Sequence, residues 1–261
     1  MTRSSDFIWD VQINLTDATP NLQRLDVHIW YVPDLPDTSQ LHAFLPLLSP
    51  RERRQAQSYY TVHDMSHFVV RRSILRLLLA RYLHCSPDQL TYQIGLHGKL
   101  QLTDMDQLSP IQFNLAHSHN SLLYAFTRHR RVGIDLESQD ALTDTIQYVT
   151  RFFTCREQQF LQSLPLECQP AAILNCWTRK EAYVKAIGDG LTHGLKHFEV
   201  SVLPNEPAQL LEIRGSREAA MNWTMVSLPM PSGYHATLVV EGQGWTPFYF
   251  QLETDSLMGS S

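Results

Sequence analysis

The sequence predicts an α+β fold in which the same theme of strands and helices is used twice along the chain, although no sequence repeat accompanies it. Apolar residues recur at three- and four-residue steps over two long stretches, near 50–83 and 143–187, which is the spacing of amphipathic helices. Short apolar or alternating segments indicate strands at 27–31, 111–115, 122–126, 132–137, 198–202, 223–228 and 234–241. This order of elements is typical of an α+β architecture.

Composition narrows the class of protein. Of the 261 residues, 43% are hydrophobic and 18% are charged, so the chain can form a sizeable core and is not intrinsically disordered. The formal net charge of −5 argues against a protein that holds long nucleic acids through its overall field. The longest apolar run is too short for a membrane span, and the N-terminus lacks a secretory pattern. Four cysteines without a CxxC pair indicate reduced, buried thiols, so we expect a cytoplasmic protein.

The first half is expected to contain an arm, a strand, helices and a loop. Residues 1–24 show no period and predict a loosely attached arm. The strand that follows ends before Pro33, which cannot continue a central strand. Ser49-Pro50 is a typical helix start, with Ser as N-cap and Pro in the first turn, and the helical pattern is interrupted near His63. Two glycines then bracket a loop that carries Lys99.

The second half starts at a strand and continues into helices. The helical stretch breaks near Pro165 and Pro170, and Gly188 is the expected C-terminal stop. Strands then return toward the C-terminus. The chain is therefore divided into an arm, two α+β halves and a flexible tail, at residues 1–24, 25–131, 132–250 and 251–261.

Two carboxylates lie close together on one predicted strand. Asp135 and Glu137 are two residues apart, so both point to one face while the apolar neighbours line the other. Adjacent carboxylates repel unless a cation lies between them, and their oxygens suit Mg²⁺ or Mn²⁺. The alternative is an edge strand whose outer face is solvated. The spacing alone leaves both interpretations open.

The segment from Trp177 to Lys185 is helical by composition and carries a second group of charges. Glu181 and Lys185 are four residues apart, on one helix face. They can form an ordinary surface ion pair. Alternatively, Glu181 is a third metal ligand or a base, and Lys185 contacts a phosphate.

Other candidates are weaker by spacing alone. His117 and His119 form an H-x-H pair that can bind a metal or donate to a phosphate, and a chance pair is not surprising among 12 histidines. Arg71 and Arg72 lie on the first long helical stretch, where at least one is expected near an anion site.

Taken together, three segments occur in a fixed order that closely resembles the 4′-phosphopantetheinyl transferases of the larger, Sfp-like type. They are Phe113-Asn-Leu-Ala-His117-Ser118, Val132-Gly-Ile-Asp135-Leu-Glu137 and Trp177-Thr-Arg-Lys180-Glu181-Ala-Tyr-Val-Lys185-Ala. Gly98-Lys99 before the first segment and Gly188-Asp-Gly190-Leu191 after the last also resemble this family. The similarity covers roughly residues 25–240.

The resemblance implies two pseudo-symmetric halves with the active site at their interface. It also implies transfer of the phosphopantetheine arm of coenzyme A to a serine hydroxyl of an apo carrier protein, with adenosine 3′,5′-bisphosphate as the by-product. The carriers of the family serve fatty-acid, polyketide and nonribosomal-peptide synthesis. We expect a monomer that requires Mg²⁺, with Mn²⁺ as a substitute, and that binds neither nucleic acid nor membrane.

The resemblance further implies roles for individual residues. Asp135, Glu137 and Glu181 match the acids that bind Mg²⁺, and Lys185 matches the lysine that neutralises the transferring pyrophosphate. Our own hypothesis is that Glu181, directly or through a metal-bound water, is also the base that takes the serine proton. Positions expected to contact coenzyme A are His117, Ser118, Lys99, Arg72 and Lys185. The chain departs from the family at Ala116, where a serine is frequent, so one hydrogen bond to a phosphate is expected to be absent.

Two other classes of function compete with this one. A Mg²⁺-dependent phosphodiesterase or nuclease would use the same acids but is expected to have a more basic surface. A non-catalytic, coenzyme A-binding regulator would not need the four charged positions Asp135, Glu137, Glu181 and Lys185.

Overall fold

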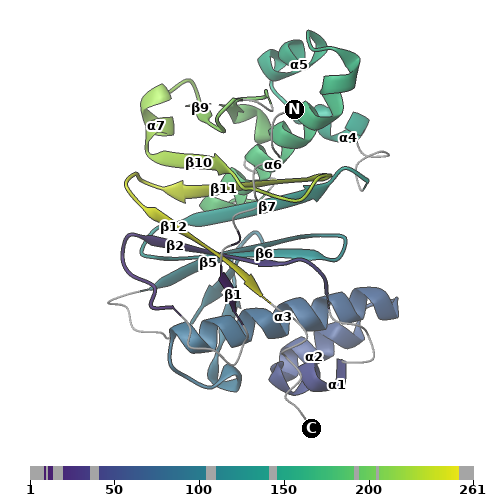
Figure 1. Cartoon of the computed structure of the whole chain (residues 1–261), viewed down its shortest axis with the longest axis vertical. Coiled ribbons are helices and arrows are strands. Elements are labelled where there is room, and N and C mark those ends of the chain that lie inside the picture. The colour runs from purple at the N-terminus through teal and green to yellow at the C-terminus, as the bar shows by residue number, and fades with distance from the viewer. Residues whose placement is uncertain are drawn as a thin grey trace.

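The elements of the protein stack in four layers, with two sheets inside and helices outside (Figure 1). The computed structural model describes Trp9 and residues 11–13, 20–35, 41–103, 110–140, 146–190, 194–203 and 206–252. One apolar core lies between the sheets, and a further core lies between each sheet and its helices. The α+β prediction is confirmed.

The larger sheet has five strands and forms the base of the first half. Its spatial order is β1 (Val11–Ile13), β12 (Thr246–Leu252), β2 (Asp26–Val32), β6 (Ser121–Arg128) and β5 (Ile111–Ser118). β12 runs parallel to both of its neighbours, and the other pairs are antiparallel.

The smaller sheet is antiparallel and has the order β10 (Trp223–Ser227), β11 (Tyr234–Glu241) and β7 (Val132–Ser138). Two hairpin-like ladders complete the strands. They pair β3 (Tyr92–Ile94) with β4 (Leu100–Leu102), and β8 (Phe198–Val200) with β9 (Leu210–Ile213).

Two long helices cover the outer faces of the sheets, α3 (Val62–Tyr82) on the five-stranded sheet and α6 (Gln169–Ile187) on the three-stranded sheet (Figure 1). The remaining α-helices are α1 (Leu41–Phe44), α2 (Pro50–Gln57), α4 (Ile146–Thr150), α5 (Cys155–Gln162) and α7 (Arg217–Met221). Short 3₁₀ helices are η2 (Leu45–Leu47), η3 (Pro87–Gln89), η5 (Leu166–Cys168) and η7 (Leu195–His197). None of the described helices has the length and hydropathy that a membrane span requires.

The predicted helix boundaries are largely confirmed. Ser49 caps α2 in a reciprocal capping box with Glu52, and Gly188 ends α6 in a left-handed conformation. The predicted break near His63 falls slightly earlier, because Thr61 caps α3 through the backbone N–H of Asp64.

Both ends of the predicted division are wrong where the structure describes them. Trp9 is buried against Tyr31, and β1 pairs with β12, so the arm is attached to the sheet. β12 lies in the sheet of the first half rather than in residues 132–250, and its last two residues belong to the strand and not to the tail. Pro247 is unusual within a strand, but β1 pairs with Phe250–Leu252, so among the described residues no strand pairs with β12 on that side at Pro247.

The cysteines are free, as predicted, but only Cys176 is buried. Cys85 is half-buried, and the expectation of burial is wrong for Cys155 and Cys168, which are exposed. Both exposed residues lie at helix boundaries, Cys155 in the first turn of α5 and Cys168 just before α6, where the apolar face does not reach them.

The two sheets are joined at a seam between β5 and β7 by side chains. Asn114 Oδ1 accepts a hydrogen bond from the backbone N–H of Ile134 at 2.9 Å, and Ser118 Oγ accepts one from Ser138 at the same distance. These bonds satisfy backbone donors at the edge of β7 that its own sheet leaves unpaired. They also fix β5 beside β7, and so the first half against the second.

Strand β7 places its polar residues against α6. Val132, Ile134 and Leu136 belong to the core between the sheets, which turns the alternate residues Gly133, Asp135 and Glu137 toward the helix. The alternative of a solvated strand face is therefore wrong, since Asp135 is only 4% exposed.

We expect Gly133→Ala to lower the free energy of unfolding by about 3 kcal/mol or more. A Cβ at this position would lie 2.0 Å from the carbonyl oxygen of Ala182 and 2.3 Å from the amide nitrogen of Ala186, so α6 or β7 must shift. Urea denaturation measures the change. Gly95→Ala is the control, because its Cβ meets nothing closer than 3.3 Å. A Gly133→Ala variant as stable as the wild type would contradict the close approach of α6 to β7.

Candidate active site

A pocket of about 930 Å³ lies between the two halves. Its walls come from α2, α3, the β3–β4 turn and β5 of the first half and from β7 and α6 of the second. Seven of the eight predicted site residues line it, namely Arg72, Lys99, His117, Asp135, Glu137, Glu181 and Lys185. Ser118 is the exception, because its buried hydroxyl belongs to the seam between the sheets.

The acidic side of the pocket is built by β7 and α6 facing each other. Lys185 Nζ donates a hydrogen bond to Asp135 Oδ1 at 2.6 Å. The ion pair expected within the helix, between Glu181 and Lys185, is replaced by this pair between helix and strand. Lys185 therefore compensates the charge of a nearly buried carboxylate.

The residues of the segment from Trp177 to Lys185 lie on two different faces of α6. Trp177 Nε1 donates to Glu137 Oε1 at 3.2 Å and so holds the second carboxylate of β7. Lys180, next to Glu181 in sequence, is fully buried on the opposite side of α6. Its ammonium lies 2.9 Å from Glu157 Oε1 and donates to the carbonyls of Leu195 and Phe198. Lys180 is thus an internal anchor of α6, and Glu181 faces the pocket.

Burial and mutual repulsion raise the pKa of two carboxyl groups. Burial and then the charge of Asp135 raise the pKa of Glu137 to about 7, against the opposing hydrogen bond from Trp177. The same two causes raise the pKa of Glu181 to about 7, opposed by Lys185. Burial lowers the pKa of Lys185, but Asp135 together with Glu181 and Glu137 outweighs burial, so the pKa is raised. Three carboxylates therefore share one compensating cation.

The donor set fits a divalent cation. Asp135 Oδ2 and Glu181 Oε1 are buried and have no hydrogen-bond partner among the described residues. Buried carboxylate oxygens without partners are costly, and a hard cation is the ligand that would satisfy them. As placed, the described side chains do not form a cluster of three His, Cys, Asp or Glu ligands, and Asp135 is instead paired with Lys185.

The opposite wall of the pocket is basic. Arg71 Nη1 and His117 Nε2 are in hydrogen-bond contact. Partial burial of the ring and then the charge of Arg71 lower the pKa of His117. The residue as a whole is exposed at the pocket mouth, so this desolvation is partial, and the direction of the shift favours a neutral ring that accepts from Arg71.

Arg72 is held in place by a buried ion pair. Its Nε lies 3.3 Å from Glu52 Oε1, and its guanidinium packs over the rings of Phe68 and Tyr92. Its Nη1 is buried and has no partner among the described residues. A planar guanidinium with an unused N–H donor on a pocket wall is suited to a phosphate.

Lys99 was expected to contact a phosphate with its ammonium, but the structure directs this group to backbone carbonyls. Its ammonium donates to the backbone carbonyls of Val132, Lys185 and Ala186, and only its stem lines the cavity. Sequence reasoning missed His97 and Gln55, which also line the pocket. His97 lies in a loop without a period, and Gln55 on a helix with many polar residues, so neither carried a usable signal.

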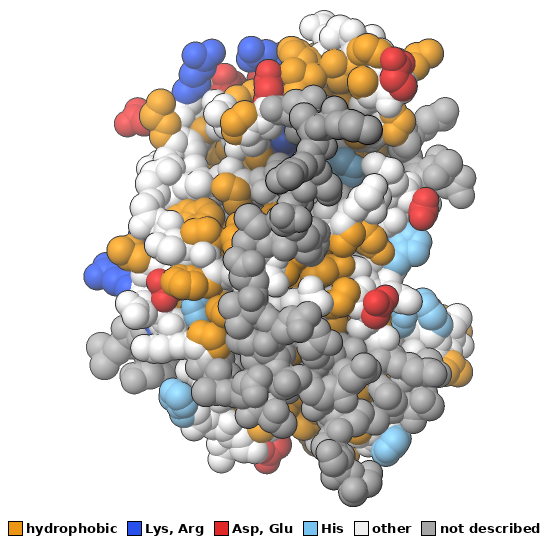
Figure 2. Space-filling view, viewed as in Figure 1, with side chains coloured by type: hydrophobic (Ala, Val, Ile, Leu, Met, Phe, Trp, Pro, Cys, Tyr) orange, Lys and Arg blue, Asp and Glu red, His pale blue; other side chains and the backbone are white. Residues whose placement is uncertain are grey.

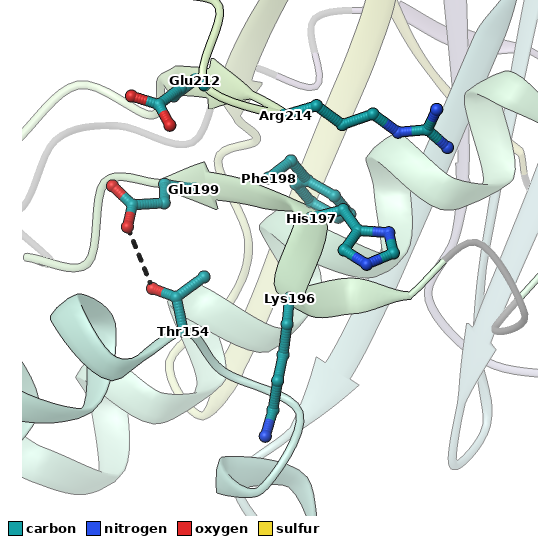
Figure 3. Close-up of a pocket in the computed structure, with 8 residues that line it drawn as sticks. Thr154, Lys196, His197, Phe198, Glu199, Glu212 and Arg214 are labelled. Carbon is teal, nitrogen blue, oxygen red and sulfur yellow. Dashed lines mark hydrogen bonds between the residues drawn. The ribbon is translucent and has the colours of Figure 1, made fainter.

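A second cavity, of about 480 Å³, lies between η7, β8 and β9 on the other side of α6 (Figure 3). Its lining mixes both signs of charge, and Thr154 Oγ1 donates to Glu199 Oε1 at 3.3 Å. The ammonium of Lys196 points away from the guanidinium of Arg214 in Figure 3. Because its charges do not converge, the pocket between the halves is the candidate active site.

We expect Glu181→Gln to stabilise the metal-free protein at alkaline pH. Between the unfolded-state pKa of 4.5 and the folded value of about 7, the folded chain keeps this carboxyl protonated while the unfolded chain ionises it. Rising pH therefore stabilises the unfolded state through this range and has no further effect above it. The variant should gain about 3 kcal/mol over the wild type between pH 4.5 and 8.

Urea denaturation in a chelating buffer at several pH values measures this difference. Glu218→Gln, at an exposed position on α7, is the control and should show no such trend. A pH-independent difference between Glu181→Gln and the wild type would show that the Glu181 carboxyl is not destabilised by its site.

Comparison with known proteins shows the family of the chain. A family model described as the 4′-phosphopantetheinyl transferase superfamily matches residues 131–239, which carry the three carboxylates. The 4′-phosphopantetheinyl transferase HetI of Nostoc sp. is 36% identical over 88% of this chain and 95% of its own length.

Two further relatives are more distant. The 4′-phosphopantetheinyl transferase gsp of Aneurinibacillus migulanus is 30% identical over 63% of this chain and 67% of its own. The 4′-phosphopantetheinyl transferase Sfp of Bacillus subtilis is 24% identical over 60% and 67%. The relative HetI matches nearly end to end, and the family model covers the acidic site. The chain therefore belongs to the 4′-phosphopantetheinyl transferase superfamily, in its Sfp-like branch, and its enzyme class is that of a phosphopantetheinyl transferase.

Proposed function

We propose that this protein moves the 4′-phosphopantetheine group of coenzyme A onto a serine hydroxyl of an apo carrier protein in a Mg²⁺-dependent reaction. One observation carries the proposal: a single pocket opposes three carboxylates and Lys185 to a wall of Arg71, Arg72 and His117. An acidic side that attracts a metal and a basic side that attracts phosphates suit a metal-assisted transfer from a pyrophosphate.

The metal would be held by Asp135, Glu137 and Glu181. Their charge, their burial and the unpartnered oxygens of two of them support this assignment. When bound, Mg²⁺ supplies neutralisation of the pyrophosphate charge and orientation for in-line attack. Trp177 would fix Glu137 in that set through its indole N–H.

The phosphates of coenzyme A would lie on the basic wall. His117 with Arg71 and the unused Nη1 of Arg72 are the donors best placed there. Ala116 lines the same wall without a hydroxyl, and the Arg71 guanidinium beside His117 offers N–H donors in its neighbourhood. Lys185 would shift its ammonium from Asp135 toward the charge that develops on the reacting oxygens.

The transfer itself needs a base. The serine oxygen forms a bond to the phosphorus on the pantetheine side, the bond to the bridging oxygen breaks, and adenosine 3′,5′-bisphosphate leaves. Glu181, which faces the pocket beside Lys185, would take the serine proton directly or through water. The transfer experiment described next also distinguishes this reaction from the nuclease and the non-catalytic, coenzyme A-binding regulator. The net charge of −5 argues against a nuclease, and Figure 2 shows acidic and basic side chains interspersed on the face drawn.

We expect the wild type, with coenzyme A and Mg²⁺, to add one phosphopantetheine mass to an apo carrier protein, and Asp135→Asn to lose this activity by about a thousandfold or more. The substitution keeps the size of the side chain but removes one metal ligand charge and the partner of Lys185. Intact-mass spectrometry of the carrier measures transfer, and thermal unfolding shows that the variant is folded. Transfer without Mg²⁺ in chelator, or full activity of Asp135→Asn, would refute the metal assignment. No mass gain on fatty-acid, polyketide and peptide carriers would refute the proposed reaction.

The carrier would dock beside Trp177, on a patch formed by Tyr148, Arg151 and Phe152. Tyr148 is 52% exposed, and the Arg151 guanidinium lies 3.3 Å from the centre of its ring. Phe152 packs against Trp177, which places the patch next to Glu137. Phe153, the next residue in the sequence, is fully buried in the core and is not part of the patch.

Charge favours an acidic partner at this patch. An adjoining groove of about 400 Å³ is lined by Arg151 and Lys196, and the described residues that line it include no Asp or Glu. Carrier proteins are usually acidic, so a basic and aromatic surface beside the metal site would bring their serine to the reacting phosphorus.

We expect Arg151→Glu to raise the KM for an acidic carrier about tenfold while leaving kcat and the KM for coenzyme A nearly unchanged. The effect should shrink at high ionic strength, since it arises from charge at an exposed position. Steady-state kinetics at two salt concentrations measures both. Arg217→Glu, an equally exposed reversal on α7, serves as control. Equal carrier KM values for the two variants would place the docking surface elsewhere.

A further inference from the structure

Lys99 connects the two halves of the protein through a single ammonium group. It follows the β3–β4 turn, in which Gly98 has a positive φ of 87° and the backbone N–H of Gly95 donates to the Lys99 carbonyl. From there its Nζ reaches three backbone carbonyls of the second half, those of Val132 at 3.1 Å, Lys185 at 2.7 Å and Ala186 at 3.0 Å. A lysine ammonium has three N–H donors, so all of them are used.

Two of these carbonyls belong to the last turn of α6. The final carbonyls of a helix lack partners within the helix, and a cation at this end also interacts favourably with the helix dipole. Gly188 N–H caps Val184, and Lys99 supplies the bonds for the two carbonyls that follow. A side chain from the first half therefore completes the main catalytic helix of the second.

The third carbonyl marks the start of β7, so Lys99 joins the ends of the two elements that face each other across the acidic site. These elements approach so closely at Gly133 that no side chain fits between them. The stem of Lys99 is also packed, since a Cβ on Gly188 would lie 3.3 Å from its Cδ. The charge is held in a partly buried position where carbonyl oxygens take the place of water.

We propose that Lys99 is a positioning residue that fixes the last turn of α6, and with it Lys185, against β7, and that it does not bind a phosphate. Lys185 provides one of the three carbonyls, and its own ammonium lies on Asp135 at 2.6 Å. The backbone bond from Lys99 therefore sets the point from which the Lys185 side chain extends. The same bonds hold the turn with His97 and Gly98, which line the pocket, at a fixed distance from α6.

This role and a phosphate contact predict opposite kinetic patterns, provided that the proposed transfer reaction holds. In Lys99→Met the stem is kept and the donors are lost. For a positioning residue, kcat should fall about tenfold to a hundredfold, because Lys185 is misplaced, while the KM for coenzyme A changes less than about threefold. Amide hydrogen exchange in residues 184–188 should accelerate by about tenfold or more, since the last turn of α6 loses its cap.

Exchange measured by mass spectrometry and steady-state kinetics of the full chain test the proposal. Arg217→Met, which removes an exposed cation on α7, is the matched control and should change neither readout. If Lys99→Met does not fold, Lys99→Gln keeps two N–H donors at shorter reach and should shift both readouts in the same direction by less. A raised KM for coenzyme A with unchanged kcat and unchanged exchange would overturn the proposal in favour of a phosphate contact. Unchanged values in every readout would overturn it as well. If the wild type modified no carrier, the proposed function would fail, but the exchange experiment would still decide the role of Lys99.

Discussion

The contact between α6 and β7 is the constraint on which the rest of the site depends. Gly133 permits the helix backbone to approach the strand, and this approach brings Glu181 and Lys185 over Asp135 and Glu137. Three further contacts hold α6 in place. Lys180 anchors the outer face of α6 to Glu157, Trp177 bonds to β7, and Lys99 caps the C-terminal turn. A helix fixed at so many points keeps its charged groups in position without flexible loops.

Burying three carboxylates with one lysine is electrostatically unfavourable, and this imbalance is the clearest physical sign of function. The buried pair of Lys180 and Glu157, on another face of α6, is by contrast balanced, with one charge of each sign. In the pocket, burial and then the negative charge of Asp135 raise the pKa of two glutamates to about 7, and two carboxylate oxygens have no partner among the described residues. A fold retains such destabilising groups where binding of a cation or proton transfer uses them.

Patterns of neighbouring residues predicted the features that depend on nearby residues alone, such as strand faces and helix ends. The period of two placed Asp135 and Glu137 on one face, and capping chemistry located the starts of α2 and the end of α6. Contacts between distant segments were not predictable. Pro247 made β12 look unlike a strand of the first sheet, and Ser118 looked like part of a binding loop although its hydroxyl bonds to Ser138. The contacts that Lys99 and Lys180 make were not predictable either, because the backbone carbonyls that they bind carry no sequence signal.

The division of charge between the halves reconciles the acidic composition with a substrate rich in phosphate. The first half contributes Arg71, Arg72 and His117 to the pocket, and the second half contributes the carboxylates. An anionic ligand held on one wall would therefore meet the metal only when both halves keep their relative position. The seam of Asn114 and Ser118 and the ammonium of Lys99 maintain that position. Because these few bonds lie outside the acidic cluster, they can be tested apart from the chemistry, and the proposed mechanism requires that they govern its rate more than its affinity for coenzyme A.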